Sequence, residues 1–351
     1  MLDWFHYSKG IKTAVKLSDD WFTRLTGFSE RSPDEVRLHL IAEDGRLWSR
    51  VNDLSYACGL LRINSLRELR RDVTIAPHSR RMGLQLSELV GNAKQLHAAT
   101  ENAGALFQVA SQFNLLEMVS PNITPEQGVG IYEHDATQGP ACAVACGAGT
   151  IFRNYFVELD GQTGQTSTRQ VDCLVRIGEV LGNVDGRLWK MRNGYALPTA
   201  DGLKEIDSRL GAMSESELDE LRAKLEIGLQ WDTRVTLDGC DRLVTQAYCS
   251  ALPVAYSGLS SRLWERFARL ILEAAYEATL AAAVLNASNT GNRSVYLTLL
   301  GGGAFGNDQE WILSAIGRSL GVYQAFDLDV RIVSFRHSNH RIGQLVKALQ
   351  Q

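Results

Sequence analysis

The sequence SVYLTLLGGGAFGND, residues 294–308, decides the fold class and points to a ligand. Its first seven residues form an apolar run that predicts a buried strand, and residues 310–319 predict a helix. Glycines between them let the backbone take positive φ and approach a ligand closely. The N–H groups that begin the following helix are unsatisfied and favour an anion, for which a diphosphate is the natural candidate. A structural turn is the alternative, but three adjacent glycines and a fourth at Gly306 favour phosphate binding.

Strand and helix signals alternate through the rest of the chain. They predict an α/β fold, with a mostly parallel or mixed sheet and helices on both faces. Residues 1–79 are expected to form a small N-terminal α/β extension with a helix starting at Ser32, and residues 80–351 one larger domain. Other strands are expected at 106–110, 156–159, 188–197, 227–237, 243–256 and 330–335, and helices at 83–100, 139–152, 172–181, 203–210, 215–226 and 262–285.

Composition narrows the class of protein. The chain has 351 residues and a net charge of -4, which gives no basic footprint for nucleic acid or an anionic membrane surface. The apolar stretch 270–285 contains two glutamates and is too short to span a membrane, so a buried helix is expected. Six scattered cysteines and no visible signal peptide suggest a cytoplasmic protein. No CxxC or HExxH motif appears, so neither a metal site nor a cofactor is predicted.

A second segment, GVGIYEHDATQGPACA at residues 128–143, places acids in a glycine-framed loop before a predicted helix. Glu133 and Asp135 in such a loop can hold ribose hydroxyls, activate a water or receive a proton. Acids near a helix N-terminus are also simply stabilising there. The residues alone leave these two interpretations open, and His134 by itself is expected to be a surface or packed histidine.

A third segment, ASQFNLLE at residues 110–117, interrupts an apolar run with amides. Buried amides need partners, so Asn114 and Gln112 are candidates to bind a ligand hydroxyl, or to satisfy loop backbone instead. Phe335 ends the last predicted strand and can stack on a base, although a core aromatic is the commoner case.

Together these segments resemble the loops of the macrodomain and poly(ADP-ribose) glycohydrolase superfamily. Residues 298–308 look like its diphosphate-holding loop, Asn114 like the asparagine that reaches the distal ribose, and residues 128–143 stand in place of the catalytic loop. The stretch Tyr132–Ala143 is similar to one in atypical macrodomains that include a bacterial effector removing ADP-ribose from arginine. The resemblance covers residues 80–351. The Gly-Gly-Gly-x-x-x-Gln-Glu-Glu signature of poly(ADP-ribose) glycohydrolases is absent, so no catalytic role is transferred to Glu310.

The resemblance implies a macrodomain-like ADP-ribosylhydrolase acting on ADP-ribose or ADP-ribosylated protein. Asp135 is the expected main catalytic acid, with Glu133 and Asp308 as secondary acids. Arginine is the first linkage to consider, because carboxylates pair bidentately with a guanidinium. A non-catalytic reader of ADP-ribose and a hydrolase of a free ADP-ribose derivative are the alternatives. The residues expected to bind ADP-ribose are Gln112, Asn114, Thr137, Gln138, Gly139, Gly301, Gly302, Gly303, Ala304, Phe305, Gly306, Asn307 and Phe335.

Overall fold

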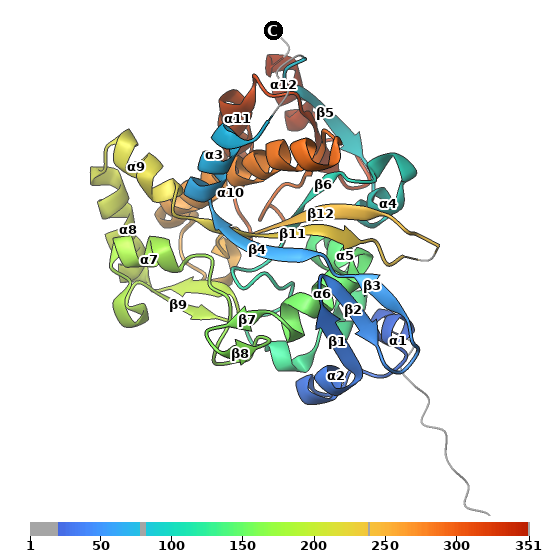
Figure 1. The fold of residues 1–351 in the computed structure, drawn as a ribbon. Helices are drawn as coiled ribbons and strands as arrows, with labels where there is room; N and C mark the ends of the chain where they lie inside the picture. The colour runs from blue at the N-terminus through green and yellow to red at the C-terminus, as the bar shows by residue number, and fades with distance from the viewer. Residues whose placement is uncertain (1–19, 78–81, 238, 350–351) are drawn as a thin grey trace, which may run out of the picture.

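The computed structural model describes residues 20–77, 82–237 and 239–349, and one seven-stranded sheet forms its centre (Figure 1). The strands lie in the order β4 (Leu60–Ser65), β11 (Glu226–Arg234), β12 (Leu243–Cys249), β6 (Leu106–Ala110), β13 (Ser294–Leu297), β14 (Asp329–Ser334) and β5 (Gln85–Val90). β11 is antiparallel to both of its neighbours, whereas the five strands from β12 to β5 are successively parallel. The sheet is therefore mixed, and the predicted α/β class is confirmed.

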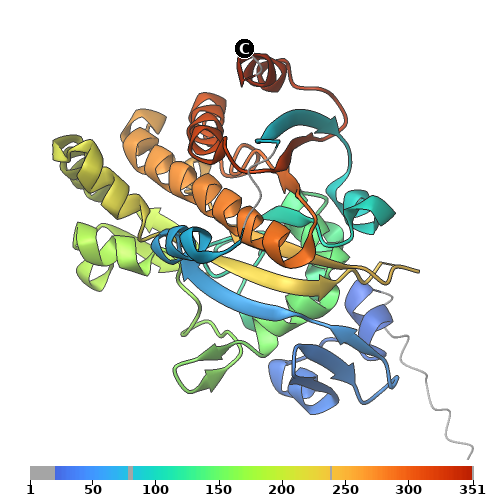
Figure 2. The same ribbon diagram turned by 45° about the horizontal axis from the view of Figure 1, so that its top comes forward.

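Helices cover both faces of this sheet (Figure 2). Alternation along β12 separates the two faces, because successive side chains of a strand point to opposite sides. The Cys249 sulfur contacts Thr279 of α10, whereas the neighbouring Tyr248 contacts Arg153 of α6. The helices that lie against the sheet or its covering helices are α3 (Leu66–Ile75), α4 (Ala93–Ala98), α5 (Gln138–Ala145), α6 (Gly147–Tyr155), α8 (Ala200–Ala212), α9 (Glu215–Arg222), α10 (Ser261–Thr290) and α11 (Gln309–Tyr323).

The long helix α10 lies at the centre of the hydrophobic core. It packs against α3, α8 and α11 and against four strands of the sheet. Within the described residues it is the one helix long and apolar enough to cross a membrane, yet 83% of its most apolar window is buried inside the fold. The expected buried helix at 262–285 is thus confirmed and extends further at both ends.

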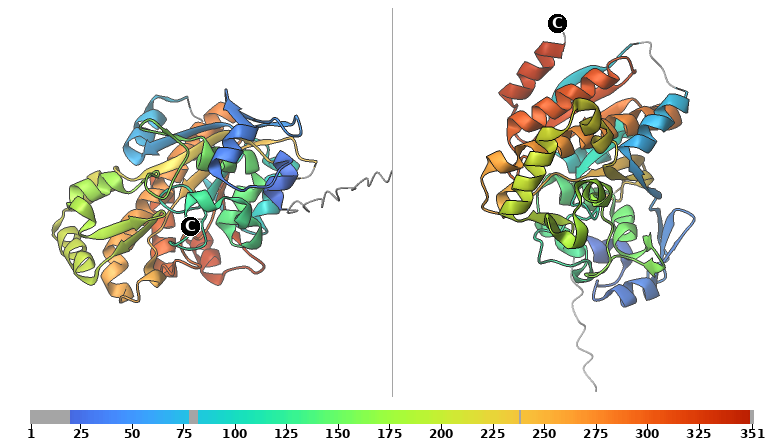
Figure 3. Two further views of the ribbon diagram at one scale, coloured as in Figure 1. Left: turned by 90° about the horizontal axis from the view of Figure 1, so that it is seen from below. Right: turned by 90° about the vertical axis from the view of Figure 1, so that its left-hand side faces the viewer.

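The N-terminal elements pack beside α5 and α6 (Figure 3). They comprise α1 (Trp21–Thr26), α2 (Pro33–His39) and an antiparallel sheet of β1 (Leu40–Glu43), β2 (Arg46–Ser49) and β3 (Ser55–Ala57). The strand β4 and the helix α3 precede residue 79, but β4 pairs with β11 and α3 packs on α10. The central sheet therefore includes residues that the sequence analysis assigned to the N-terminal extension. The cause is the apolar face of α3, which is buried against α10.

Four segments differ from the sequence-based expectation. The strand-like run expected at 243–256, with a break at Pro253, is a strand only as far as Cys249, and residues 254–256 form a 3-10 turn. Residues 83–100 were expected to be one helix, but the structure has β5, then Gly91 and Asn92, and then α4, because Asn92 caps a new helix. The helix expected at 139–152 is divided at Cys146, whose ψ of 57° is not helical. The strand expected at 188–197 is a hairpin that turns at Asn193 and Gly194.

The remaining elements are short. They are β7 (Glu158–Leu159), β8 (Gln162–Thr163), α7 (Val175–Leu181), β9 (Trp189–Arg192), β10 (Tyr195–Pro198), α12 (His340–Leu349) and the 3-10 turns η1 (Thr100–Asn102), η2 (Pro125–Gln127), η3 (Gly130–His134), η4 (Val184–Gly186) and η5 (Val254–Tyr256).

Buried charge on α10 provides a test of this packing. The Glu277 side chain is 1% exposed and accepts hydrogen bonds at 2.6 Å from Arg70 and at 2.6 Å from Arg318. In Glu277→Ala both guanidinium groups keep Asp219 as a partner but lose the buried carboxylate, so we expect the free energy of unfolding to fall by about 2 kcal/mol in urea denaturation. Glu265→Ala removes an exposed i,i+4 pair with Arg269 on the same helix and should cost less than about 0.5 kcal/mol. Equal losses in the two variants would contradict this assignment.

Candidate ligand-binding and active site

A cavity of about 610 Å³ lies at the carboxyl ends of the five parallel strands. Ligands of open α/β sheets bind outside this edge, because the loops that leave parallel strands converge there. Residues that end or follow each of the five strands line the cavity: Gly91 and Asn92 after β5, Ser111 and Gln112 after β6, Ala251 after β12, Thr298 to Gly301 after β13, and Phe335 after β14.

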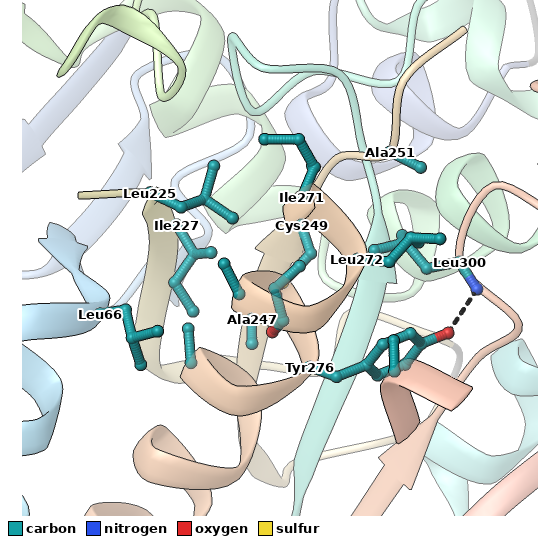
Figure 4. Packing of buried hydrophobic residues seen from close by; sticks show 14 of the residues in the cluster. Leu66, Leu225, Ile227, Ala247, Cys249, Ala251, Ile271, Leu272, Tyr276 and Leu300 are labelled. Carbon is teal, nitrogen blue, oxygen red and sulfur yellow. Dashed lines mark hydrogen bonds between the residues drawn. The ribbon is translucent and has the colours of Figure 1, made fainter. Parts of the chain in front are cut away.

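The glycine-rich loop after β13 is held by hydrogen bonds from helix α10. The Tyr276 hydroxyl of α10 donates to the Thr298 carbonyl at 2.7 Å and accepts from the Leu300 N–H at 2.8 Å (Figure 4). At its far end the Asn307 side chain donates to the Leu252 carbonyl at 2.8 Å, and the Asn307 N–H donates to Gly301. Gly301 has a φ of 74°, which a side chain rarely adopts. The loop is therefore held in one conformation before any ligand arrives.

Nine of the thirteen predicted ligand-binding residues line the cavity, and the other four do not. The predicted residues that line the cavity are Gln112, Thr137, Gln138, Gly139, Gly301, Gly303, Ala304, Phe305 and Phe335, together with the predicted acid Asp135. Gly302, Gly306 and Asn307 are in the same loop but outside the lining.

The N-terminus of α11 does not face the cavity as expected. The exposed Asp308 is the N-cap of this helix, and its carboxylate accepts the Glu310 N–H at 2.7 Å. A carboxylate therefore occupies the position where the sequence suggested an anion. Asp308 lies outside the cavity lining, so the structure gives this predicted secondary acid a capping contact in place of a cavity contact.

The helix N-terminus that does line the cavity belongs to α5. Its N-cap Thr137 makes no side-chain capping bond, and residues 137–141 line the cavity wall. Asp135, half-buried beside it, accepts the Thr137 N–H at 2.8 Å. At Gly139 a Cβ would lie 2.0 Å from the Ala110 carbonyl oxygen, so only glycine allows α5 to begin this close to β6. The Gln138 amide also bonds the β6 backbone, at Ala110 and at Gln108.

Two other predicted residues point elsewhere. Asn114 is fully buried; its amide donates to Gln170 at 2.8 Å and accepts the Leu116 N–H at 3.1 Å, so it satisfies loop structure. Glu133 accepts hydrogen bonds from the Trp21 N–H and from Arg24, both at 2.6 Å. Neither residue lines the cavity.

Glu117 was not predicted from the sequence, yet it lines the cavity although it is only 2% exposed. Its carboxylate oxygens lie 3.0 and 3.2 Å from the Arg153 guanidinium, and its N–H donates to the Tyr132 hydroxyl. Burial raises the pKa of Glu117 to about 7, although Arg153 pulls it down. An acid that changes protonation near neutral pH inside a cavity is a candidate for proton transfer.

Arg153 is itself fully buried and fixes the geometry around Glu117. Its Nε donates to the Leu115 carbonyl at 2.9 Å, and its guanidinium lies 3.6 Å from the ring centre of Tyr248, whose hydroxyl it also contacts. The available sequence signal was an arginine within the apolar helix 147–155, since a buried cation requires a buried partner.

Three aromatic side chains form part of the cavity wall. The rings of Tyr195, Tyr256 and Phe305 lie with centroids 5.2 to 5.6 Å apart. The Tyr195 hydroxyl donates to the Met118 carbonyl at 2.6 Å, which links this wall to the loop that carries Glu117. Burial raises the pKa of Tyr195, so its hydroxyl acts as a neutral donor. Among the described residues, no three His, Cys, Asp or Glu side chains are grouped to hold a metal ion.

No protein-family model matches this chain, and no curated protein matches it. Among solved structures the chain is similar to poly(ADP-ribose) glycohydrolase from Thermomonospora curvata, with 12% identity and a TM-score of 0.44 over 90% of this chain and 97% of that one. The same enzyme bound to the inhibitor ADP-HPD has 11% identity and a TM-score of 0.42, with the same coverage. Poly(ADP-ribose) glycohydrolase from Deinococcus radiodurans in complex with ADP-ribose has 13% identity and a TM-score of 0.40, over 83% and 94%. Similarity at this level does not identify a function for this chain.

The raised pKa of Glu117 predicts a pH dependence of stability. Between the ordinary value of 4.5 and about 7, the folded protein holds a proton on Glu117 that the unfolded chain releases. The associated stability is present below pH 4.5 and is lost as pH rises to 7, by ~3 kcal/mol for a shift of this size. In urea denaturation, the loss between pH 5 and pH 7 should therefore be smaller in Glu117→Gln. The same loss in both proteins would show that Glu117 is already ionised at pH 5.

Proposed function

We propose that this chain is an ADP-ribosylhydrolase, which cleaves the glycosidic bond between ADP-ribose and a protein side chain, with arginine as the first linkage. One observation carries the proposal: the cavity brings the buried acid Glu117 and the acid Asp135 together with the anchored glycine loop 298–305. The resemblance of these loops to macrodomain loops supports the same ligand.

The sheet order suggests how ADP-ribose lies. Phe335 follows β14, the glycine loop follows β13, and Gln112 and Glu117 follow β6, and these three strands are neighbours in that order. A base stacked on the exposed Phe335 would place the diphosphate at the glycine loop and the distal ribose at the acids. Backbone N–H groups of the loop and of the α5 N-terminus suit a diphosphate, and this remote grip positions the reacting bond.

The two acids have complementary roles in the proposed reaction. Protonated Glu117 donates its proton to the leaving atom as the glycosidic bond breaks and the bonding electrons pass to that atom. The Asp135 carboxylate stabilises the oxocarbenium-like carbon and takes a proton from the attacking water. An arginine leaving group fits this scheme, because the departing guanidine must be protonated and then pairs well with a carboxylate.

A reader of ADP-ribose without turnover is the second candidate. The observation that favours it is the hydrogen bond between Asp135 and the Thr137 N–H, since one carboxylate oxygen already has a backbone partner. The two candidates share the binding step and differ only in turnover.

Calorimetric titration with ADP-ribose, together with release of ADP-ribose from arginine-modified protein, separates these functions. We expect the wild type to bind and release, and Asp135→Asn to bind within about threefold while its kcat falls at least about 100-fold. Asp308→Asn should retain turnover, since asparagine caps a helix as well as aspartate does. Binding without release from arginine, serine or glutamate linkages would favour the reader, and loss of turnover in Asp308→Asn would restore that residue to the catalytic acids.

The proposed role of Glu117 predicts how kcat depends on pH. As the general acid, it must be protonated, so kcat should fall as pH rises above about 7. Glu117→Gln should lower kcat by about 100-fold or more and abolish this alkaline limb, because glutamine does not titrate. A variant that is slow but keeps the limb would assign the titration to another group.

The glycine loop allows a test of binding without disturbing the fold. A Cβ at Gly303 would meet no atom within 4 Å, so the protein itself does not require glycine at this position. Gly303→Val should leave the melting temperature unchanged but weaken ADP-ribose binding at least about tenfold, because its side chain enters the space proposed for the diphosphate. Gly343 also has open space around its Cβ position, so Gly343→Val in α12 controls for the added volume. Unchanged affinity in Gly303→Val would place the diphosphate elsewhere.

A further inference from the structure

The N-terminal segment that contains α1 holds the loop that precedes Asp135. Glu30 accepts the Val129 N–H at 3.0 Å and the Gly130 N–H at 2.6 Å. The Glu30 carboxylate also accepts a hydrogen bond from the Tyr155 hydroxyl of α6 at 2.6 Å, so it links the loop to a core helix. The Trp21 indole N–H adds a bond to the Val129 carbonyl at 3.2 Å.

The same segment holds the loop at a second point. Glu133 accepts hydrogen bonds from the Trp21 N–H and the Arg24 guanidinium. The loop glycines leave room for Glu30: a Cβ at Gly128 would lie 2.4 Å from the Glu30 carboxylate, and one at Gly130 would lie 2.9 Å from it. The glycines that frame the acidic loop in the sequence therefore make room for a side chain of the same protein.

This loop, residues 128–135, is hydrogen-bonded to both acids of the proposed reaction or contains them. Tyr132, at its centre, is 1% exposed, and its hydroxyl accepts the N–H of Glu117 at 3.0 Å. The Tyr132 carbonyl accepts the N–H of Asp135 at 3.2 Å. A shift of the loop therefore changes the position of Glu117 and Asp135 together.

We propose that Glu30 is a positioning residue for these two acids, and that residues 20–30 act as a built-in brace of the active site. This inference rests on the proposed function. Glu30 does not line the cavity, so it is not placed to contact a bound substrate. In the same way, Glu133 contributes by holding the loop against Trp21 and Arg24, and not by acting on the glycosidic bond.

The test compares Glu30→Gln and Glu30→Ala with Glu43→Gln, a control at an exposed glutamate of β1 in the same N-terminal region. Hydrogen–deuterium exchange of the ligand-free full chain should rise about tenfold in peptides covering residues 128–135 in Glu30→Gln, and more in Glu30→Ala, because oxygens that accept the Val129 and Gly130 N–H groups are lost. The value of kcat should fall about tenfold in Glu30→Gln, while the Kd for ADP-ribose stays within about threefold because the glycine loop is untouched. Glu43→Gln should change none of these.

The outcomes separate this proposal from the proposed function. Unchanged exchange at residues 128–135, or unchanged kcat in Glu30→Ala, overturns the role of Glu30 even if the wild type hydrolyses its substrate. Equal losses of kcat, affinity and melting temperature would show a general structural role and also overturn it. If the wild type releases no ADP-ribose from any linkage, the proposed function fails and the positioning of catalytic acids fails with it, whereas the exchange data still establish whether the brace exists.

Discussion

A guanidinium buried away from solvent needs hydrogen-bond acceptors for its N–H groups, and Arg153 imposes this requirement on the elements around it. Its side chain is 0% exposed, and removing one partner from such a pair typically costs several kcal/mol. Helix α6 supplies the arginine, the loop after β6 supplies Glu117 and the Leu115 carbonyl, and β12 supplies Tyr248. These three elements must therefore meet in one arrangement, and the carboxylate that meets the requirement also forms part of the cavity wall.

The polar network continues from this pair into the layer between the sheet and α5. Tyr248 bonds Gln246, whose amide contacts His97 at 3.0 Å. The His97 Nδ1 lies 2.7 Å from the Ala93 carbonyl, so Nδ1 carries the proton and Nε2 accepts from Gln246. Burial lowers the pKa of His97 to about 4, which keeps this part of the network neutral. Glu117 thus ends a dry network, whereas Asp135 sits half-exposed across the cavity, and such contrasting environments suit an acid and a base.

The sequence predicted the parts of the molecule that depend on local pattern. Apolar runs located β6, β13 and β14, and the glycines after β13 located one wall of the cavity. Glu117 was passed over in favour of Asn114 because the two lie in the same buried loop, and only the distant Arg153 decides which of them meets a charge. The prediction of a helix at residues 83–100 was wrong because it used only local preference. In the structure the pairing of β5 with β14, far along the chain, overrides that preference.

The two helix N-termini near the cavity show why a glycine-rich junction does not by itself locate an anion. The N-terminus of α11 follows the glycines directly, but Asp308 already satisfies its Glu310 N–H with a carboxylate. A second anion there would meet a like charge and lose a donor. The N-terminus of α5 has no acid in its first turn and no side-chain cap, and it begins against β6 only because Gly139 permits the contact. Of these two N-termini, the one at the cavity wall is therefore that of α5, and not the one that follows the glycine loop.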